Sequence, residues 1–448
     1  MRPRGTSPRP RRPAPTSSTW YPTAEPGRDR YPDALRAGAL VVVVLGHWLA
    51  TLPRMDGGRL VGTEHLLRIW DLAGLLTWVV QVVPLFVFVS AAVSADGVAR
   101  RMREGGRELH WWAGRALGLA RPTLTYLAVL AALALGVHLT GGRLLAAFDR
   151  SLTVHLWFLI MLLAVQALLP LSVRADRRFG PWMVVALVVL VALGDLSRAG
   201  AAGLDDARRF GAHVVDGGGG WAWINLLLAW LVPQQLGIAW KRGRFGGAPA
   251  GLAFLALGAA WLLAALRVGY PAAMVGVGLA GNNMLPPTLA LLGVMWLQVG
   301  AVLLFETPAR RLLERRPFTR AVALLSALGM PLYLWHKLAE PPAAWIAERL
   351  RLPIDAGDPG DAGFWLGRLG WIGLCALVVA PVLVAVVAFE RRRRVEVATT
   401  DVTARIVGGG VALLAGLAMG VVPGALIGLG CVGAASWLLR APPPRLAT

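Results

Sequence analysis

The sequence is poor in cysteine, in lysine and in charged residues of either sign. Its two cysteines, Cys375 and Cys431, both lie in apolar segments, which excludes a disulfide framework, a CxxC redox motif and a thiolate metal site. Lysine occurs only at Lys241 and Lys337, and charged residues make up 16% of the 448 positions. With 56% hydrophobic residues, the chain has too much apolar content for an ordinary soluble domain.

Short motifs of several enzyme classes are also missing. The chain contains no Walker-type phosphate-binding loop and no HExxH zinc motif. The histidines His47, His138, His155 and His336 show none of the short spacings that bring metal ligands together. We therefore predict no metal site and no resident cofactor. The net charge of +20 does not indicate a nucleic-acid partner, because the arginines fall in clusters between hydrophobic segments.

Long hydrophobic runs, in contrast, recur along the whole chain. A helix needs roughly 20 apolar residues to cross a hydrocarbon core of about 30 Å, and we expect spans near 33–52, 70–95, 115–139, 151–171, 180–197, 221–240, 248–267, 284–305, 318–340 and 365–389. The predicted fold is all-α, a polytopic integral membrane helical bundle with a ten-helix core. Two shorter apolar stretches, 406–422 and 424–439, leave room for an extra C-terminal hairpin, whose crossing of the membrane stays open.

Arginine is distributed unevenly between the two sides of this bundle. Clusters at 100–107, 174–178, 310–316 and 391–394 all fall on the side of the N-terminus. The positive-inside rule therefore predicts a multi-pass protein of the cell membrane with a cytoplasmic N-terminus. We expect a disordered basic cytoplasmic tail at 1–32 and the membrane domain at 33–390. Residues 391–448 would hold a basic run, the two short apolar segments and a tail.

One arginine and one histidine lie inside the first predicted span, in the stretch RAGALVVVVLGHWLA. Arg36 and His47 are eleven residues apart, which places them within roughly 20° of one helix face and about 16 Å apart along the axis. A charge at such depth costs at least about 2.5–3.5 kcal/mol, so it should face protein, water or an anion. Asp33 is spaced to pair with Arg36. Arg36 reaching lipid phosphate and His47 being a structural histidine stay open.

An ordered set of strings extends this observation. The segment RYPDALRAGALVVVVLGHWLA resembles the first helix of the integral-membrane acyltransferase-3 family, whose signature is a basic residue, ten residues and then a histidine. The similarity continues through VPLFVFVSAAVSA (83–95), GRALGLARPTLTY (114–126), HLWFLIMLLAVQALLP (155–170), NLLLAWLVPQQLGIAW (225–240) and LGMPLYLWHK (328–337). It covers approximately 33–390. Each string is degenerate by itself, and the ordered set is much more specific.

The resemblance implies a membrane-bound O-acyltransferase that moves an acyl group from cytoplasmic acyl-CoA to a hydroxyl of a sugar, cell-envelope glycan, lipid or secondary metabolite. It implies that His47 is the catalytic base, a role that suits neutral imidazole. Arg36 would act with it, attracting CoA phosphates or the developing oxyanion. Donor phosphate binding falls to Arg115 and Arg121. The family often has two arginines three residues apart, whereas Gly118 stands at that spacing here, so whether Arg121 replaces the second arginine stays open.

Further residues are predicted to neighbour the substrate site: His336, Ser90, Trp157, Asn225 and Gln235. His336 is expected at the depth of His47, and Glu340 one turn later would orient it or pair with Lys337. The alternative for His336 and for Trp157 is packing in an interfacial aromatic belt. For Asn225 and Gln235 it is hydrogen bonding between helices. Ser90 is not needed as a nucleophile, because a direct transfer requires none.

A transporter or lipid-linked glycan flippase is the competing function. Buried arginine and a midplane cavity occur in such proteins too. We see no internal repeat in the sequence, and the ordered strings match an enzyme family, so we expect acyl transfer. The partners expected are acyl-CoA, a hydroxyl-bearing acceptor and the lipid bilayer. The identities of the acyl chain and the acceptor, and the oligomeric state, lie beyond what one sequence specifies.

Overall fold

A computed structural model describes residues 29–105, 108–140, 148, 151–217, 220–276, 282–355, 357–392, 399–400, 402–421 and 425–441. Of the predicted tail at 1–32, residues 1–28 lie outside the described residues. The same holds for 393–398, which contain the end of the predicted basic run.

Helices make up nearly all of the described chain, as predicted. The first half contains α1 (Tyr31–Ala50), α2 (Leu66–Ile69), α3 (Ala73–Val80), α4 (Val83–Arg103), α5 (Glu108–Thr140), α6 (Ser151–Val154), α7 (Trp157–Ala167), α8 (Leu169–Phe179) and α9 (Trp182–Asp205). The second half contains η2 (Ala207–Arg209), α10 (Phe210–Asp216), η3 (Gly220–Ile224), α11 (Asn225–Lys241), α12 (Gly247–Arg267), α13 (Leu289–Leu313), α14 (Arg316–Trp335), η4 (Lys337–Ala339), α15 (Glu340–Leu350), α16 (Ala362–Arg392), α17 (Thr403–Val421) and α18 (Ala425–Leu439).

Nine helices of the described part are long and apolar enough to cross a membrane. They are α1, α3 continued by α4, α5, α9, α12, α13, α14, α16 and α17, and the pair α6–α7 and α8, bent by 49°, would make ten. The predicted span at 221–240 corresponds to η3 and α11, and α11 has only 17 residues. The polytopic helical bundle is therefore confirmed.

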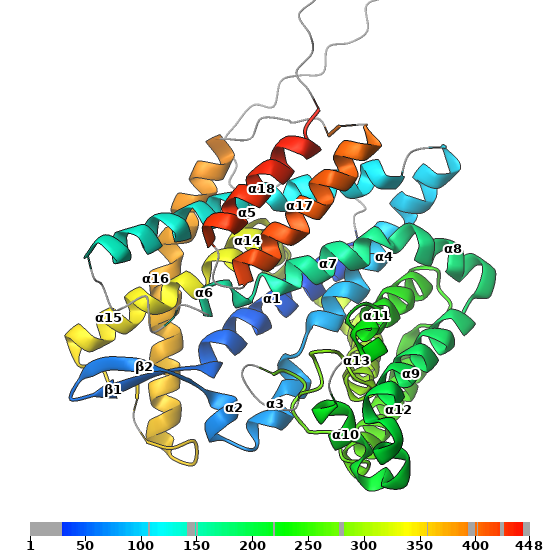
Figure 1. Cartoon of the computed structure of the whole chain (residues 1–448), viewed down its shortest axis with the longest axis horizontal. Coiled ribbons are helices and arrows are strands. Elements are labelled where there is room, and N and C mark those ends of the chain that lie inside the picture. The colour runs from blue at the N-terminus through cyan, green and yellow to red at the C-terminus, as the bar shows by residue number, and fades with distance from the viewer. Residues whose placement is uncertain are drawn as a thin grey trace, which may run out of the picture.

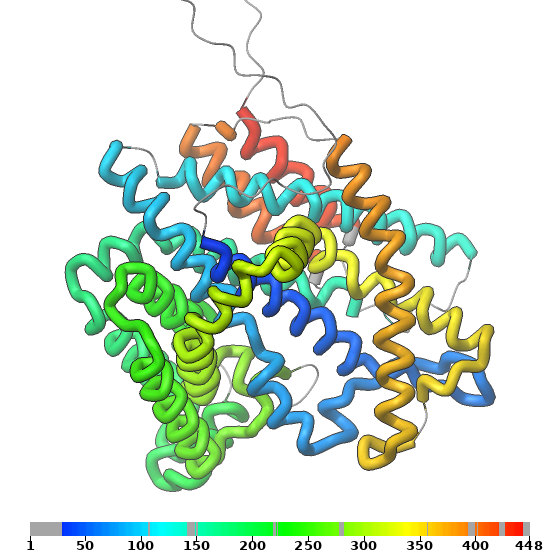
Figure 2. Tube along the Cα trace, turned by 180° about the vertical axis from the view of Figure 1, so that it is seen from behind, coloured from blue at the N-terminus to red at the C-terminus, as the bar shows by residue number. Residues whose placement is uncertain are grey.

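The first helix lies in the middle of this bundle. Figure 1 shows α1 between α4, α14 and α16, with α9 and α12 in a peripheral group and α17 and α18 along another side. The view from behind in Figure 2 shows the same central position. Pro32 in its first turn and Asp33 beside the positive helix end favour the start of α1. Both ends of α1 thus meet other helices, which is what positions Arg36 and His47.

A β-hairpin follows α1 and was not predicted. Strand β1 (Thr51–Asp56) pairs antiparallel with β2 (Arg59–His65) through a turn at Gly57 and Gly58, whose φ angles of 54° and 78° suit glycine. Arg54 links this hairpin to the segment after α15, because its Nη1 donates a hydrogen bond to Asp355 Oδ1 at 2.8 Å. The turn signal, the Gly57-Gly58 pair, was present in the sequence.

Two segments between the predicted spans contain short helices. The region 198–220 includes the end of α9, η2 and α10, and the region 341–364 includes most of α15. Gly211 of α10 approaches the backbone of Tyr270 closely enough that a Cβ atom would lie 2.2 Å from its nitrogen. Short amphipathic helices of this kind carry too few apolar residues to stand out in a search for spans.

The C-terminal pair α17–α18 forms a helical hairpin against the rest of the bundle. It packs on α5 and α7. Small residues allow the contact, since a Cβ on Gly410 would lie 2.5 Å from the Trp112 ring and one on Gly428 would lie 2.9 Å from the Gly416 carbonyl oxygen. Of the two helices, α17 has the length of a span and α18 is shorter.

Candidate active site

Two histidines meet where the last turn of α1 touches the end of α14. His47 Nδ1 lies 2.8 Å from His336 Nε2, and the two rings stack with centroids 5.0 Å apart and an interplanar angle of 16°. His336 is fully buried, whereas His47 keeps part of its surface exposed. A hydrogen bond therefore joins a partly buried histidine to one that is closed off from solvent.

The backbone of α14 fixes the proton positions of this pair. His336 Nδ1 lies 2.8 Å from the carbonyl oxygen of Tyr333 and 3.2 Å from that of Leu332. Because a carbonyl only accepts, His336 Nδ1 must carry a proton, and in the neutral ring Nε2 is then an acceptor. We infer that His47 Nδ1–H donates to it, which leaves a lone pair on His47 Nε2. With this lone pair, His47 Nε2 can accept a proton, as a general base must.

A third histidine lies beside the pair. The His155 ring meets those of His336, Tyr126 and Tyr333 edge-on, with centroid distances of 5.3, 5.6 and 5.4 Å. The backbone of Leu334 lies nearby, but neither ring nitrogen of His155 makes a well-formed hydrogen bond within the described part of the chain. No group of three His, Cys, Asp or Glu side chains among the described residues is arranged to hold a metal ion.

A buried ion pair lies directly after His336. Lys337 Nζ is 2.6 Å from Glu340 Oε1, and both side chains are almost completely buried. Lys337 also donates to Thr51 Oγ1 at 3.0 Å, and that hydroxyl lies within donating distance of Glu340 Oε1 and of the His47 carbonyl. The network thereby ties the C-terminal end of α1 to η4 and α15. Of the two predicted roles of Glu340, the structure shows the pair with Lys337, and the contact of Thr51 was not predicted.

Other donors hold the same end of α1 in place. Trp48 Nε1 donates to the His336 carbonyl at 3.0 Å, and Trp371 Nε1 donates to the Trp48 carbonyl at 2.9 Å. Arg368, buried on α16, donates to the Thr51 carbonyl at 2.8 Å and to the Ile354 carbonyl. Sequence reasoning missed Arg368 because nothing in the order of residues shows that its partner lies 317 positions away.

The β-hairpin brings one further histidine near this network. His65, at the end of β2, accepts a hydrogen bond at Nδ1 from the Leu67 amide at 3.2 Å. Burial, with additional repulsion from Lys337 and Arg68, lowers the pKa of its imidazole to about 4. His65 is therefore neutral at pH 7 and adds no charge next to the buried pair.

The arginines of the predicted donor site divide into two places. Arg36 Nη2 pairs with Asp33 Oδ1 at 2.6 Å, as the spacing predicted. Arg115 donates to Ser94 Oγ at 2.7 Å, stacks over the Trp111 ring at 4.6 Å and lies close enough to Arg36 for their charges to interact. Arg36 and Arg115 thus gather positive charge at the end of α1 opposite His47.

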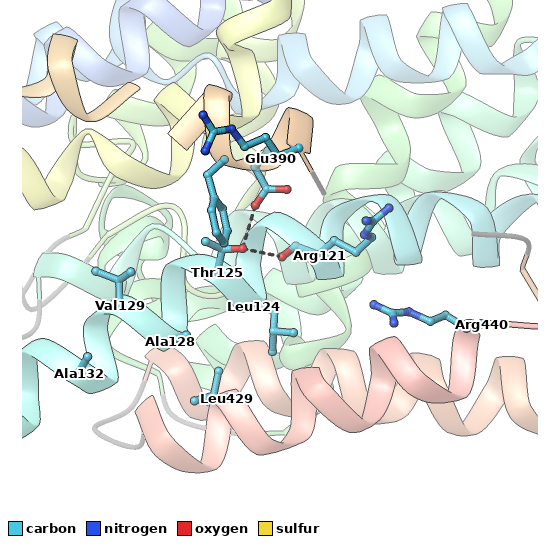
Figure 3. Close-up of a pocket in the computed structure, with 11 residues that line it drawn as sticks. Arg121, Leu124, Thr125, Ala128, Val129, Ala132, Glu390, Leu429 and Arg440 are labelled. Atoms are coloured by element: carbon cyan, nitrogen blue, oxygen red, sulfur yellow. Dashed lines mark hydrogen bonds between the residues drawn. The ribbon is translucent and has the colours of Figure 1, made fainter. Parts of the chain in front are cut away.

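Arg121 lies elsewhere. Six positions after Arg115 on α5, its side chain lines a cavity formed with the end of α16 and with α18 (Figure 3). An offset of six residues turns a side chain by about 240°, to another face of the helix. The structure therefore brings Arg115 to Arg36 but not Arg121.

The remaining predicted neighbours are scattered. Asn225 is buried and donates to Asp195 Oδ1 and to the Val191 carbonyl, both at 3.1 Å, which links α11 to α9. Trp157 packs against Trp230, with ring centroids 6.2 Å apart. Gln235 is buried on α11, and its Nε2 has no partner among the described residues. Ser90 lies on α4 and is partly buried. His336, in contrast, hydrogen-bonds to His47 and stacks on its ring.

The family of the chain follows from its match to a family model. The model described as an acyltransferase domain, of the acyltransferase-3 membrane proteins, matches residues 29–390. No curated protein sequence and no solved structure matches the chain. Because the match covers most of the chain, the protein belongs to the acyltransferase-3 family. The resemblance seen in the ordered strings is confirmed, and membership decides in favour of a membrane acyltransferase over a transporter. The segments α17 and α18 lie outside the matched residues.

Proposed function

We propose that this protein is a membrane O-acyltransferase that uses acyl-CoA as donor and a hydroxyl of a sugar, cell-envelope glycan, lipid or secondary metabolite as acceptor. One observation carries the proposal: the hydrogen bond between His47 and the buried His336, whose proton positions leave His47 Nε2 free to accept a proton. The proposal places the protein in the cell membrane with its N-terminus in the cytoplasm.

The donor would approach from the end of α1 that carries Arg36. Two neighbouring guanidinium groups, those of Arg36 and Arg115, suit the phosphates of CoA, because guanidinium binds phosphate through several donors at once. The rise of a helix puts His47 about 16 Å further along the same axis. The phosphates would thus stay near the arginines while the extended thioester arm reaches toward the histidine.

The transfer itself needs one proton acceptor. As the acceptor hydroxyl oxygen attacks the thioester carbon, its proton passes to His47 Nε2, and the new imidazolium keeps its Nδ1–H bond to His336. The C–S bond then breaks, and the leaving thiolate takes the proton back, giving the ester and free CoA. His336 acts as a positioning residue that holds the productive tautomer. No acyl-enzyme is formed in this scheme.

The test is thiol release from acyl-CoA by the full chain in nanodiscs supplied with pooled cell-envelope extracts. The parent should release CoA and acylate an envelope component, and His47→Ala should lower kcat by about 10²–10⁴-fold. His138→Ala, which removes an exposed histidine at the far end of α5, is the matched control and should match the parent. Normal transfer by His47→Ala would refute the base, and no CoA release with any extract would refute the donor.

A further inference from the structure

A large cavity lies on the flank of the bundle, away from the histidine pair. It has a volume of about 1010 Å³ and is lined by residues of α5, α16 and α18. Phe389 of α16 lines it 18 positions after Trp371, the residue that holds the His47 end of α1, which corresponds to about 27 Å along the helix. The cavity is therefore separate from the proposed site of acyl transfer.

The α5 wall changes in character along its length. Arg121, Leu124, Thr125, Ala128, Val129 and Ala132 line the cavity, a spacing that keeps them on one helix face. Figure 3 shows the Arg121 and Arg440 side chains at one end and Val129 and Ala132 at the other. The wall is thus cationic at one end and apolar at the other, as an amphipathic anion requires.

The charged residues that line the cavity are unequal in number. Three arginines, Arg121, Arg392 and Arg440, line the cavity together with one carboxylate, that of Glu390. The Glu390 carboxylate accepts a hydrogen bond from Thr125 Oγ1 at 2.8 Å. Arg440 uses Nη2 to reach Ser436 Oγ, and its buried Nε finds no partner within the described residues. The lining of the cavity therefore carries more positive than negative charge, and Arg440 has an unused N–H donor.

The length and position of the cavity indicate which anion fills it. From Arg121 to Ala132 is about 16 Å along α5, close to half of the roughly 30 Å hydrocarbon core. Ala128 and Ala132 are exposed on the outside of the bundle, where Leu133 and Leu135 are exposed as well. The cavity thus spans about one leaflet on the surface that faces the bilayer.

We propose that this cavity binds one anionic phospholipid, with its phosphate at Arg121 and Arg440 and an acyl chain along Ala128 and Ala132. Because α18 supplies Leu429 and the residue directly after it is Arg440, the C-terminal hairpin outside the family match completes the site. Arginine beside a membrane surface favours anionic lipid by about 1 kcal/mol each. The proposal is independent of acyl transfer, since lipid binding needs no turnover.

Native mass spectrometry of the full chain, released from detergent with phosphatidylglycerol or phosphatidylcholine of equal chain length, tests the site. The parent should retain one phosphatidylglycerol in preference to phosphatidylcholine. The double variant Arg121→Gln/Arg440→Gln should bind it about thirtyfold more weakly. The double variant Arg101→Gln/Arg103→Gln, at the exposed end of α4, removes the same charge elsewhere and should bind like the parent.

A second variant tests the apolar part without changing charge. Ala128→Phe would fill the path of the acyl chain and should abolish lipid retention, and Ala132→Phe repeats the test if the first variant is not monodisperse. Equal retention of both lipids, or unchanged binding by the arginine double variant or the phenylalanine variants, would overturn the proposal. Displacement of phosphatidylglycerol by palmitoyl-CoA with an equal loss in Ala128→Phe would also overturn it, by assigning the cavity to the donor.

Discussion

His47 and His336 share a hydrogen bond of 2.8 Å although 289 positions separate them in the chain. In this pair the fully buried imidazole of His336 accepts a hydrogen bond from the Nδ1–H group of His47. The end of α14 is tied to α1 through Trp48 as well as through the rings. A shift of either helix would break the orientation on which the proposed base catalysis depends.

The positioning role of His336 predicts a graded response to substitution. His336→Ala should lower kcat by about 10²–10⁴-fold, and adding His47→Ala should cost little more, because residues that act as a unit are not additive. His336→Gln should recover part of the loss, since an amide oxygen accepts the same N–H. Initial rates of CoA release measure all three variants. A kcat of His336→Ala within twofold of the parent would show that the pair is only structural.

The pair of arginines predicts an effect confined to donor binding. Arg36→Ala and Arg115→Ala should each raise the KM for acyl-CoA about 10- to 100-fold, the range of a charge-assisted hydrogen bond, with a smaller change in kcat. With an acyl-pantetheine donor, which lacks the CoA phosphates, each variant should have the same KM as the parent. Arg121→Ala, on the other face of α5, should leave the KM unchanged. Equal loss with both donors would point to packing instead.

The buried ion pair predicts asymmetric losses of stability. Lys337→Met should destabilise the protein by about 3–5 kcal/mol, because it leaves the Glu340 carboxylate buried without its partner. Lys337→Met/Glu340→Leu should recover part of that loss. Lys241→Met removes a lysine that lies 3.6 Å from Asp96, with both side chains well exposed, and should stay near the parent. The fraction of each variant that stays monodisperse after heating measures its loss of stability. Equal losses in Lys337→Met and Lys241→Met would contradict the prediction.

The contact of α11 with α4 predicts opposite effects for two helical glycines. A Cβ on Gly237 would lie 2.1 Å from the carbonyl oxygen of Phe88, so Gly237→Ala should force the helices apart and cost at least about 1–3 kcal/mol. Gly97 has no atom within 4 Å of such a position, and Gly97→Ala should stabilise α4 by about 0.5–1 kcal/mol. Thermal inactivation curves distinguish them, and a neutral Gly237→Ala would show that this contact is loose.

Several features of the site were predictable because they are local. Helical periodicity placed Arg36 and His47 on one face of α1, and the spacing of three residues predicted the ion pair of Asp33 with Arg36. It also offered the pair of Lys337 with Glu340 as one of two alternatives. Whether Asn225 and Gln235 lie at the substrate site or form hydrogen bonds between helices stayed open, because that choice is not local. The partner of Asn225 is Asp195 on another helix, and no local pattern encodes that choice.

The sequence by itself determined the class of the protein. Long apolar runs, scarce charge and an ordered set of strings were enough for a helical membrane bundle and for its family, because burial in lipid constrains composition directly and over whole segments. Only the tertiary structure decided which of the histidines meet, that Arg121 lies apart from Arg115, and that α18 completes a cavity with α5 and α16. Those facts depend on how helices distant in the chain pack side by side, and side-chain packing and hydrogen-bond geometry leave no periodic trace in the order of residues.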